Sequence, residues 1–150
     1  MKLKIPPVLV LIVAGFMNLG LSKMVPALNF TFSYQIEISW ILAFIGGFFG
    51  LAGIFTFIQH RTTVDPVNID KASELVTDGI YRISRNPMYV GMLLLLIGWT
   101  EKMGNPLGLL GIIFFVAFMN LNQIIPEEGM LEGKFGASYK EYCSKTRRWL

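Results

Sequence analysis

Long apolar runs separated by polar stretches dominate the pattern of the chain. The apolar runs cover about 6–21, 38–58, 87–100 and 106–125. At about 1.5 Å of rise per residue, a helix needs roughly 20 residues to cross a hydrocarbon core of about 30 Å. The run at 87–100 is shorter than this, so we expect it to tilt, to start deep or to thin the bilayer locally. The pattern predicts an all-α integral membrane protein with about four transmembrane helices.

The last segment, 126–150, has a different pattern. Leu131, Phe135, Tyr139 and Tyr142 recur at spacings of four, four and three residues, and charged residues occupy positions between them. Such spacing places the four side chains on one face of a helix and the charges on the other. We therefore expect a C-terminal amphipathic helix that lies at the membrane surface, an interfacial helix.

The composition agrees with this pattern. Hydrophobic residues make up 53% of the 150 residues and charged residues 15%, which excludes an ordinary soluble domain and favours a single membrane domain over 1–150. Cys143 is the only cysteine, so neither a disulfide scaffold nor a multi-cysteine metal site is expected. The basic residues form no continuous stripe, so we expect membrane lipid as a partner and no nucleic acid. Gly46 and Gly50 form a GxxxG motif, which lets a neighbouring helix approach closely.

The distribution of Lys and Arg predicts the orientation. With four crossings, the side that holds both termini carries eleven of the 13 basic residues, namely Lys2, Lys4, Arg61, Lys71, Arg82, Arg85, Lys134, Lys140, Lys145, Arg147 and Arg148, and the other side carries Lys23 and Lys102. Because cytoplasmic loops are enriched in Lys and Arg, we expect both termini, the loop at 60–86 and the segment 126–150 to be cytoplasmic, in a multi-pass protein of a prokaryotic inner membrane. We interpret the N-terminal run as a retained first helix and not as a cleaved signal.

The loop at 60–86 ends in a dense group of polar and aromatic residues. Within Arg85-Asn86-Pro87, side-chain donors stand next to the free N–H groups of a helix start, an arrangement that suits a carboxylate or phosphate. The same residues fit a simpler role, in which the arginine anchors the loop at the interface and Asn86 caps the helix. Residue types alone favour the anchoring role.

A second group follows the fourth apolar run, where Glu127 and Glu128 stand side by side. Carboxylates at the end of a membrane helix either face water and the dipole of the next helix or pair with a cation, and both alternatives stay open. The motifs of common soluble enzymes, HExxH, the P-loop, GxSxG and CxxC, do not occur in the sequence.

Taken together, the two groups resemble the superfamily of isoprenylcysteine carboxyl methyltransferases and phospholipid methyltransferases. Its pattern is L-V-x-x-G-x-Y-x-x-x-R-[HN]-P-x-Y-x-G, then a hydrophobic hairpin, then E-E-x-x-L-x-x-x-F-G-x-x-Y. The chain matches the first part from Leu75 to Gly91 and the second from Glu127 to Tyr139. Two motifs in order around a hairpin are far more specific than either alone. The resemblance implies a membrane methyltransferase that uses S-adenosylmethionine and releases S-adenosylhomocysteine.

The resemblance also implies a site. Its cofactor-binding residues are Glu74, Leu75, Val76, Tyr81, Asn86, Pro87, Met88, Tyr89 and Glu127. Its catalytic residues are Arg85, Glu127 and Glu128: Arg85 or the helix start holds the cofactor carboxylate, and one glutamate acts as a base if the nucleophile is an amine. Gln123 and Met92 would contact the acceptor. No metal is required.

Two positions depart from the superfamily pattern. Asn86 stands where histidine is frequent, and asparagine does not titrate near neutral pH, so a proton-transfer role is not expected there. Gln123 stands where carboxyl-methylating relatives carry an arginine for the substrate carboxylate. An uncharged amide implies a carboxylate head group that is held less firmly, or a different head group.

We therefore expect methyl transfer to a lipophilic small-molecule or lipid acceptor, similar to that of isoprenylcysteine carboxyl methyltransferases. The acceptor would enter sideways from the bilayer beside Met88 and Met92. The alternatives are a phospholipid amine N-methyltransferase and a non-enzymatic membrane scaffold. A scaffold predicts that Tyr81, Asn86 and Glu127 point to unrelated places, whereas an enzyme predicts that they converge.

Overall fold

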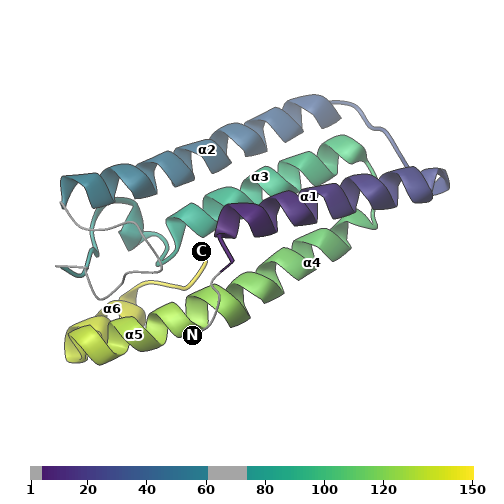
Figure 1. The fold of residues 1–150 in the computed structure, drawn as a ribbon. Helices are drawn as coiled ribbons and strands as arrows, with labels where there is room; N and C mark the ends of the chain where they lie inside the picture. Colours follow the sequence, from purple (N-terminus) through teal and green to yellow (C-terminus); the bar gives the residue numbers. More distant parts are fainter. Residues whose placement is uncertain (1–4, 61–73) are drawn as a thin grey trace.

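Four long helices run side by side in the computed structural model, which describes residues 5–60 and 74–150 (Figure 1). They are α1 (Pro7–Met24), α2 (Gln35–Gln59), α3 (Pro87–Met103) and α4 (Gly108–Met119), and the short 3-10 helices η1 (Pro26–Leu28) and η3 (Gly79–Arg82) lie in the connections. The described residues contain no β-strand, so the all-α prediction is confirmed. The basic positions predicted at 2, 4, 61 and 71 lie outside the described residues.

Three stretches of helix are long and apolar enough to cross a membrane. They are Pro7–Met24, Gln35–Gln59 and Gly108–Phe135, with mean hydropathies of 1.7, 2.3 and 1.9. The third predicted segment, α3, extends three residues beyond its predicted end, and its 17 residues still make only about 26 Å. The outer face of α2 exposes large apolar side chains, among them Phe44 at 80% and Leu51 at 71%. Apolar surface on this scale fits a helix that faces lipid.

α2 and α3 pack backbone to backbone. A Cβ atom added to Gly46 would lie 2.7 Å from the carbonyl oxygen of Gly91, and one added to Gly91 would lie 2.6 Å from that of Gly46. Such distances leave no room for a side chain, so this contact uses the GxxxG motif predicted in α2. The start of α3 also packs against α2, where Pro87 and Met88 lie beside Gly53.

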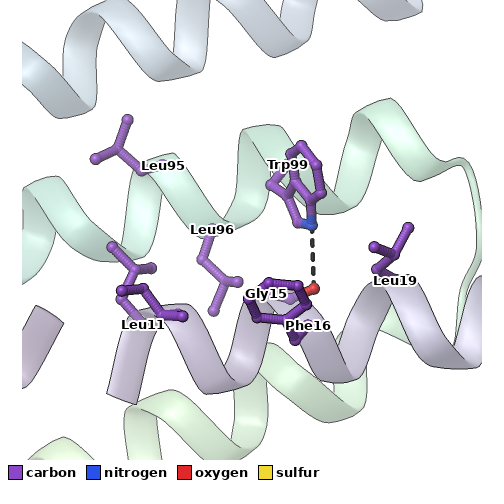
Figure 2. A pocket seen from close by; sticks show the side chains of 8 residues that line it. Leu11, Gly15, Phe16, Leu19, Leu95, Leu96 and Trp99 are labelled. Carbon is purple, nitrogen blue, oxygen red and sulfur yellow. Dashed lines mark hydrogen bonds between the residues drawn. The ribbon is translucent and has the colours of Figure 1, made fainter. Parts of the chain in front are cut away.

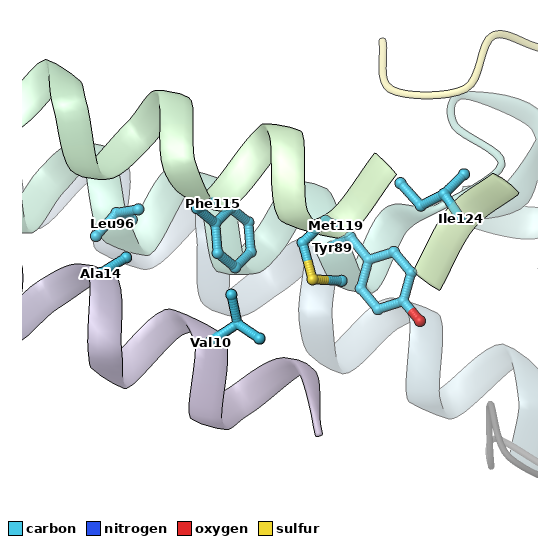
Figure 3. Close-up of a cluster of buried hydrophobic side chains, with 7 residues drawn as sticks. All are labelled: Val10, Ala14, Tyr89, Leu96, Phe115, Met119 and Ile124. Carbon is cyan, nitrogen blue, oxygen red and sulfur yellow. The ribbon is translucent and has the colours of Figure 1, made fainter. Parts of the chain in front are cut away.

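The main core lies between α1, α3 and α4. Its buried side chains are Val10, Ala14, Tyr89, Leu96, Phe115, Met119 and Ile124 (Figure 3). Tyr89 lies at one end of this cluster, and its hydroxyl points away from the apolar side chains (Figure 3). A buried polar pair ties α1 to α3 deeper in the bundle, where Nδ2 of Asn18 donates to Oγ1 of Thr100 over 2.7 Å.

The helix that begins with α4 does not end at Pro126, where the sequence analysis predicts a new segment. It continues through a π-helical turn, η4 (Asn120–Ile124), into α5 (Ile125–Phe135). Proline in an α-helix removes one N–H and clashes with the carbonyl four residues earlier. The extra residue of a π turn moves that carbonyl away from the ring. The predicted boundary is therefore wrong, because the π turn accommodates the proline.

The predicted amphipathic helix consists of two helices. α5 ends at Gly136, whose φ of +52° suits glycine, and α6 (Ala137–Lys145) follows. The prediction of one continuous helix is wrong at this point. The four apolar residues of its predicted face nevertheless gather in one cluster with Val76, Ile80 and Tyr81 of the preceding loop. This cluster ties α5 and α6 to the end of the α2–α3 connection.

The start of α1 and the C-terminus lie toward the same end of the bundle. Figure 1 shows η3, α5 and α6 at that end, and the α1–α2 and α3–α4 connections at the opposite end. The two motif-bearing regions therefore lie on one side of the apolar helices. We call this side the polar end.

Candidate functional site

The two motif-bearing regions meet through Tyr89 and Glu127. The Tyr89 hydroxyl donates to the Glu127 carboxylate, at 3.0 Å and 3.2 Å from its two oxygens. Pro87 stands in the first turn of α3, where a proline ring is tolerated, and Tyr89 follows on a buried position that is 7% exposed. A hydrogen bond from a buried hydroxyl to a carboxylate is among the stronger hydrogen bonds in proteins. It joins α3 to α5.

Tyr81 belongs to the same region. Its side chain is 5% exposed, and its ring contacts Phe57 of α2 edge to face with centroids 5.2 Å apart. Its hydroxyl has no hydrogen-bond partner among the described residues. Burial raises the pKa of this hydroxyl, and the proximity of Tyr142 and Glu127 raises it further. Tyr81 therefore presents a buried, protonated hydroxyl near Glu127.

A charge cluster lies beside this pair and consists of Arg85, Glu128 and Arg148. The Glu128 carboxylate accepts from Nη2 of Arg85 at 3.0 Å, and from Nη2 and Nε of Arg148 at 2.6 and 3.0 Å. The hydrogen bond to Glu128 raises the pKa of Arg148. Nε of Arg85 is buried and has no partner among the described residues. Glu128 therefore links the start of α3 to the C-terminal residues.

The C-terminal tail, residues 146–150, runs along the segment before α3. The Arg85 N–H donates to the Arg147 carbonyl over 2.9 Å, and Nδ2 of Asn86 donates to the Arg148 carbonyl over 2.9 Å. Nε1 of Trp149 donates to Oδ1 of Asn120 in the π turn over 3.2 Å. This tail has no sequence signal beyond a basic and aromatic ending without a motif, so its contacts could not be predicted.

The enzyme interpretation predicts that Tyr81, Asn86 and Glu127 converge. Glu127 lies near enough to raise the pKa of the Tyr81 hydroxyl, while the Asn86 side chain contacts the tail. Arg85 and Glu128, both predicted as catalytic, pair with each other. The two glutamates thus have different surroundings although they are adjacent in sequence.

Other predicted cofactor residues lie farther out. Glu74 is exposed and lies 3.2 Å from Nδ1 of His60, whose Nε2 lies 2.9 Å from Asp78. Hydrogen bonds with Glu74 and then Asp78 raise the pKa of His60. Leu75 and Val76 pack in the cluster that holds Tyr81.

The predicted acceptor residues, Met92 and Gln123, lie deeper in the bundle. Met92 packs against the core between α1, α3 and α4. Met88, predicted to bind the cofactor, contacts Gly53 of α2. Gln123 lies in the π turn and is 1% exposed. Its Nε2 donates to the carbonyl of Ile5, immediately before α1, over 2.6 Å. An N-terminal residue thus contacts the predicted acceptor position, which sequence spacing gave no reason to expect.

An apolar groove of about 360 Å³ opens between α1 and α3 (Figure 2). Its lining residues are Leu11, Ile12, Gly15, Phe16, Leu19, Leu95, Leu96 and Trp99. Within the groove, Nε1 of the Trp99 indole on α3 donates to the Gly15 carbonyl on α1 over 3.1 Å. Met88 and Met92, which the sequence analysis places beside the acceptor path, do not line this groove. The groove shares α3 with Tyr89.

Comparison with known proteins identifies the family to which the chain is similar. The model of the phospholipid methyltransferase family matches residues 34–138, which extend from the start of α2 into α6 and include the first motif and all but the last residue of the second. The match therefore also includes α2, which lies outside the two motifs that carry the resemblance. No solved structure matches the chain significantly.

Several individual proteins are similar to the chain. An uncharacterised protein of Haemophilus influenzae is 49% identical over 63 residues, which are 42% of this chain and all of that protein. Protein-S-isoprenylcysteine O-methyltransferase A of Arabidopsis thaliana is 30% identical over 106 residues, 71% of this chain and 54% of the plant protein. Protein-S-isoprenylcysteine O-methyltransferase of Schizosaccharomyces pombe is 30% identical over 120 residues, 79% of this chain and 50% of the yeast protein. The chain spans about half the length of the plant and yeast relatives.

Proposed function

The chain belongs to the phospholipid methyltransferase family, and from this premise we propose that it transfers a methyl group from S-adenosylmethionine to a lipophilic acceptor at the cytoplasmic face of the membrane. The observation that carries the proposal is the hydrogen bond between Tyr89 and Glu127, because it joins the two segments that the family resemblance assigns to the cofactor. The excess of Lys and Arg at the polar end supports a cytoplasmic site.

The residues at the polar end fit the proposed cofactor. S-adenosylmethionine supplies a methyl group activated by a sulfonium, and it also carries an ammonium and a carboxylate. Glu127 would hold a cationic group. Arg85 Nε and the Tyr81 hydroxyl are buried donors without partners among the described residues, as expected of groups that bind an acceptor atom on a ligand. The rings of Tyr81 and Tyr89 would provide aromatic faces for a base or a cation.

The contribution of the chain to the reaction would be orientation. Methyl transfer is an in-line displacement, and holding the two reacting atoms in line can lower the barrier by about 7–11 kcal/mol. The Tyr89 hydroxyl fixes the Glu127 carboxylate, so Glu127 contacts the cofactor in this proposal. Two guanidinium groups hold Glu128, which therefore positions Arg85 and the tail and is not the base.

The apolar groove between α1 and α3 supports a lipophilic acceptor. Its lining is apolar, and it lies between α1 and α3 (Figure 2). The same helix α3 carries Tyr89 nearer its start. Leu96, in the groove, and Tyr89 are seven residues apart on α3 and both belong to the main core. An acceptor with an apolar tail could therefore reach the polar end from within the bilayer, along this groove and not along the path expected beside Met88 and Met92.

Binding of S-adenosylhomocysteine to the purified protein tests the proposal. We expect Glu127→Gln to weaken binding by about 1–3 kcal/mol, roughly five- to 150-fold, because a charge-assisted contact to a cationic group is lost. Glu132→Gln is the matched control, since Glu132 lies on the same helix and pairs with Lys140 in an exposed contact. Isothermal titration calorimetry of the protein in nanodiscs measures both affinities.

The rival proposal, a non-enzymatic membrane scaffold, predicts that the protein does not bind S-adenosylhomocysteine. Failure of the wild-type protein to bind S-adenosylhomocysteine or to release it from S-adenosylmethionine would support that rival. Equal affinities of Glu127→Gln and Glu132→Gln, in protein that binds the ligand, would remove Glu127 from the cofactor site.

A further inference from the structure

Two lysines stand at the end of the bundle opposite the polar end. Lys23 lies in the last turn of α1 and Lys102 in the last turn of α3, and both residues are exposed. The positive-inside pattern leaves this side with no other basic residue. Among the described residues, neither lysine forms an ion pair with a carboxylate. Both ammonium groups are therefore available to an external anion.

Both lysines lie on the helix faces that form the apolar groove. On an α-helix, residues three, four or seven positions apart share a face. Lys23 follows the groove residues Phe16 and Leu19 by seven and four positions. Lys102 follows Trp99 by three, and its Nζ lies 5.8 Å from the centroid of the Trp99 ring. Figure 2 shows Leu19 and Trp99 at the same end of the groove. The two ammonium groups therefore stand beyond that end.

The carboxylates at this end of the bundle are on other faces. Glu101 follows Trp99 by two residues, and at about 100° per residue it points to the opposite side of α3. Glu37 precedes Ser39 by two residues on α2, and the Ser39 carbonyl lies against α3 at Gly98. By the same rotation, Glu37 points away from α3. The end of the groove is therefore positively charged, although this end of the bundle also carries acidic residues.

A simpler explanation treats each lysine separately. A cation in the last turn of a helix offsets the helix dipole, and a long side chain can reach the membrane interface. This explanation determines how far along its helix each lysine stands, but it does not determine the face. Lys23 and Lys102 come from different helices and both stand on the groove face. Their shared position indicates a common ligand that has an apolar part and an anionic part.

We propose that the groove and the two lysines bind one anionic phospholipid from the membrane leaflet at this end of the bundle. One acyl chain would lie in the groove, whose lining is apolar, and the phosphate would lie between Lys23 and Lys102. An ammonium group forms charge-assisted hydrogen bonds with phosphate oxygens.

This lipid is not the methyl acceptor, so the inference goes beyond the proposed function. Lys102 follows Tyr89 by 13 residues on α3, which corresponds to about 20 Å along the helix. A phosphate held by Lys102 is therefore far from the polar end. The acceptor tail of the proposed function would use the same apolar lining, so the two chains would occupy the groove alternately.

Two lipids with identical acyl chains test the charge preference. Phosphatidylglycerol carries a net negative charge, whereas the choline of phosphatidylcholine offsets the charge of its phosphate. Native mass spectrometry of the full chain in detergent micelles measures the affinity for each added lipid. We expect the wild-type protein to bind phosphatidylglycerol about tenfold more tightly than phosphatidylcholine, because two lysines face its phosphate.

The charge variants identify the lysines. The double variant Lys23→Gln, Lys102→Gln should lose the preference, with affinities for the two lipids equal to within about twofold. Lys140→Gln is the matched control, because it removes one positive charge from an exposed lysine at the polar end, where Lys140 pairs with Glu132. It should keep the preference of the wild type.

The groove variants identify the position of the acyl chain. A Cβ atom added to Gly15 would lie 3.9 Å from the Trp99 ring, an ordinary contact, so a larger side chain there extends into the groove. Gly15→Leu should therefore weaken binding of both lipids by about tenfold. Gly20→Leu is the control on the same helix, because Gly20 does not line the groove and an added Cβ has nothing within 4 Å. Thermal unfolding in the same micelles checks that all variants are folded.

A second measurement locates the chain directly. Phosphatidylglycerol with a diazirine in one acyl chain should label 11–19 and 95–99 on irradiation, and this labelling should fall in Gly15→Leu and persist in Gly20→Leu. Equal affinities of the wild type for the two lipids overturn the inference. A preference that survives the double lysine substitution overturns it as well, and so does binding or labelling that is the same in Gly15→Leu and Gly20→Leu. Lipid binding is measured without S-adenosylmethionine, so these outcomes leave methyl transfer standing, and failure to bind S-adenosylhomocysteine counts against the methyltransferase alone.

Discussion

Replacing Glu128 by glutamine tests whether this carboxylate is a structural link. Its oxygens accept from Arg85 at 3.0 Å and from Arg148 at 2.6 Å and 3.0 Å. The Glu128 and Arg85 side chains are 19% and 13% exposed, whereas that of Arg148 is 38% exposed. The substitution removes the negative charge from between two cations and replaces one acceptor oxygen by a donor. Arg85 is then left largely buried without a countercharge.

The magnitude follows from these exposures. An exposed ion pair contributes about 0–1 kcal/mol, and breaking a buried pair by removing one partner costs about 3–5 kcal/mol. The Arg85 contact is close to the buried case, and solvent screens the Arg148 contact. We therefore expect Glu128→Gln to lower the free energy of unfolding by about 2–4 kcal/mol. The tail should also separate from the segment before α3, because Arg148 loses its anchor.

Two measurements check this expectation. Denaturant unfolding of the protein in mixed micelles gives the free energy, and carboxypeptidase digestion reports the release of Trp149 and Leu150. Glu132→Gln provides the control, since the pair of Glu132 with Lys140 is 52% and 70% exposed and should contribute about 0–1 kcal/mol. Equal effects of Glu128→Gln and Glu132→Gln, or a tail that resists digestion as in the wild type, would refute the structural role. A stable Glu128→Gln variant that loses methyl transfer to amines would instead support a role of Glu128 as the general base.

Two further predictions concern α2 and its neighbours. Gly91→Ala should lower the free energy of unfolding by about 1–3 kcal/mol, because the new Cβ would lie 2.6 Å from a carbonyl oxygen of α2. Gly47→Ala is the control and should have little effect, because a Cβ added there has nothing within 4 Å. Thermal unfolding compares the two variants. Contacts with Glu74 and Asp78 raise the pKa of His60, so protonation stabilises the end of α2. That stabilisation should be complete below the unfolded pKa of about 6.5 and lost as pH rises through the folded pKa. Amide hydrogen exchange at the end of α2 should therefore accelerate with pH more in the wild type than in His60→Gln.

The sequence predicts the features that depend on local chemistry. The lengths of the apolar runs predict four helices and the shortness of α3, because hydrophobicity and helical rise act residue by residue. The GxxxG motif of α2 predicts a close helix contact, which forms with α3. The two apolar runs between the loop and the C-terminal segment also predict that these two regions lie at one end of the bundle, because a hairpin returns the chain to that end.

The features that it does not predict depend on contacts between distant residues. Pro126 reads as a helix end, yet a π turn lets the helix continue, and nothing local in 120–124 distinguishes a π turn from an α turn. The contact of Gln123 with Ile5 spans 118 residues, and that of Glu128 with Arg148 spans 20. Such partners depend on how the helices pack, so residue types alone left the environment of both glutamates open.

The π turn also decides which of the two adjacent glutamates faces the bundle. Neighbouring residues on an α-helix point about 100° apart, so Glu127 and Glu128 cannot face the same way. The extra residue of the π turn rotates everything after it by about the same angle relative to α4. In the observed register Glu127 contacts Tyr89 in the core, and Glu128 contacts Arg148 of the tail. Without the extra residue, α5 would turn back by one position and point a different side chain at Tyr89. The helix register therefore determines which carboxylate contacts Tyr89 and which one holds the tail, and this explains why two chemically identical neighbours have separate partners.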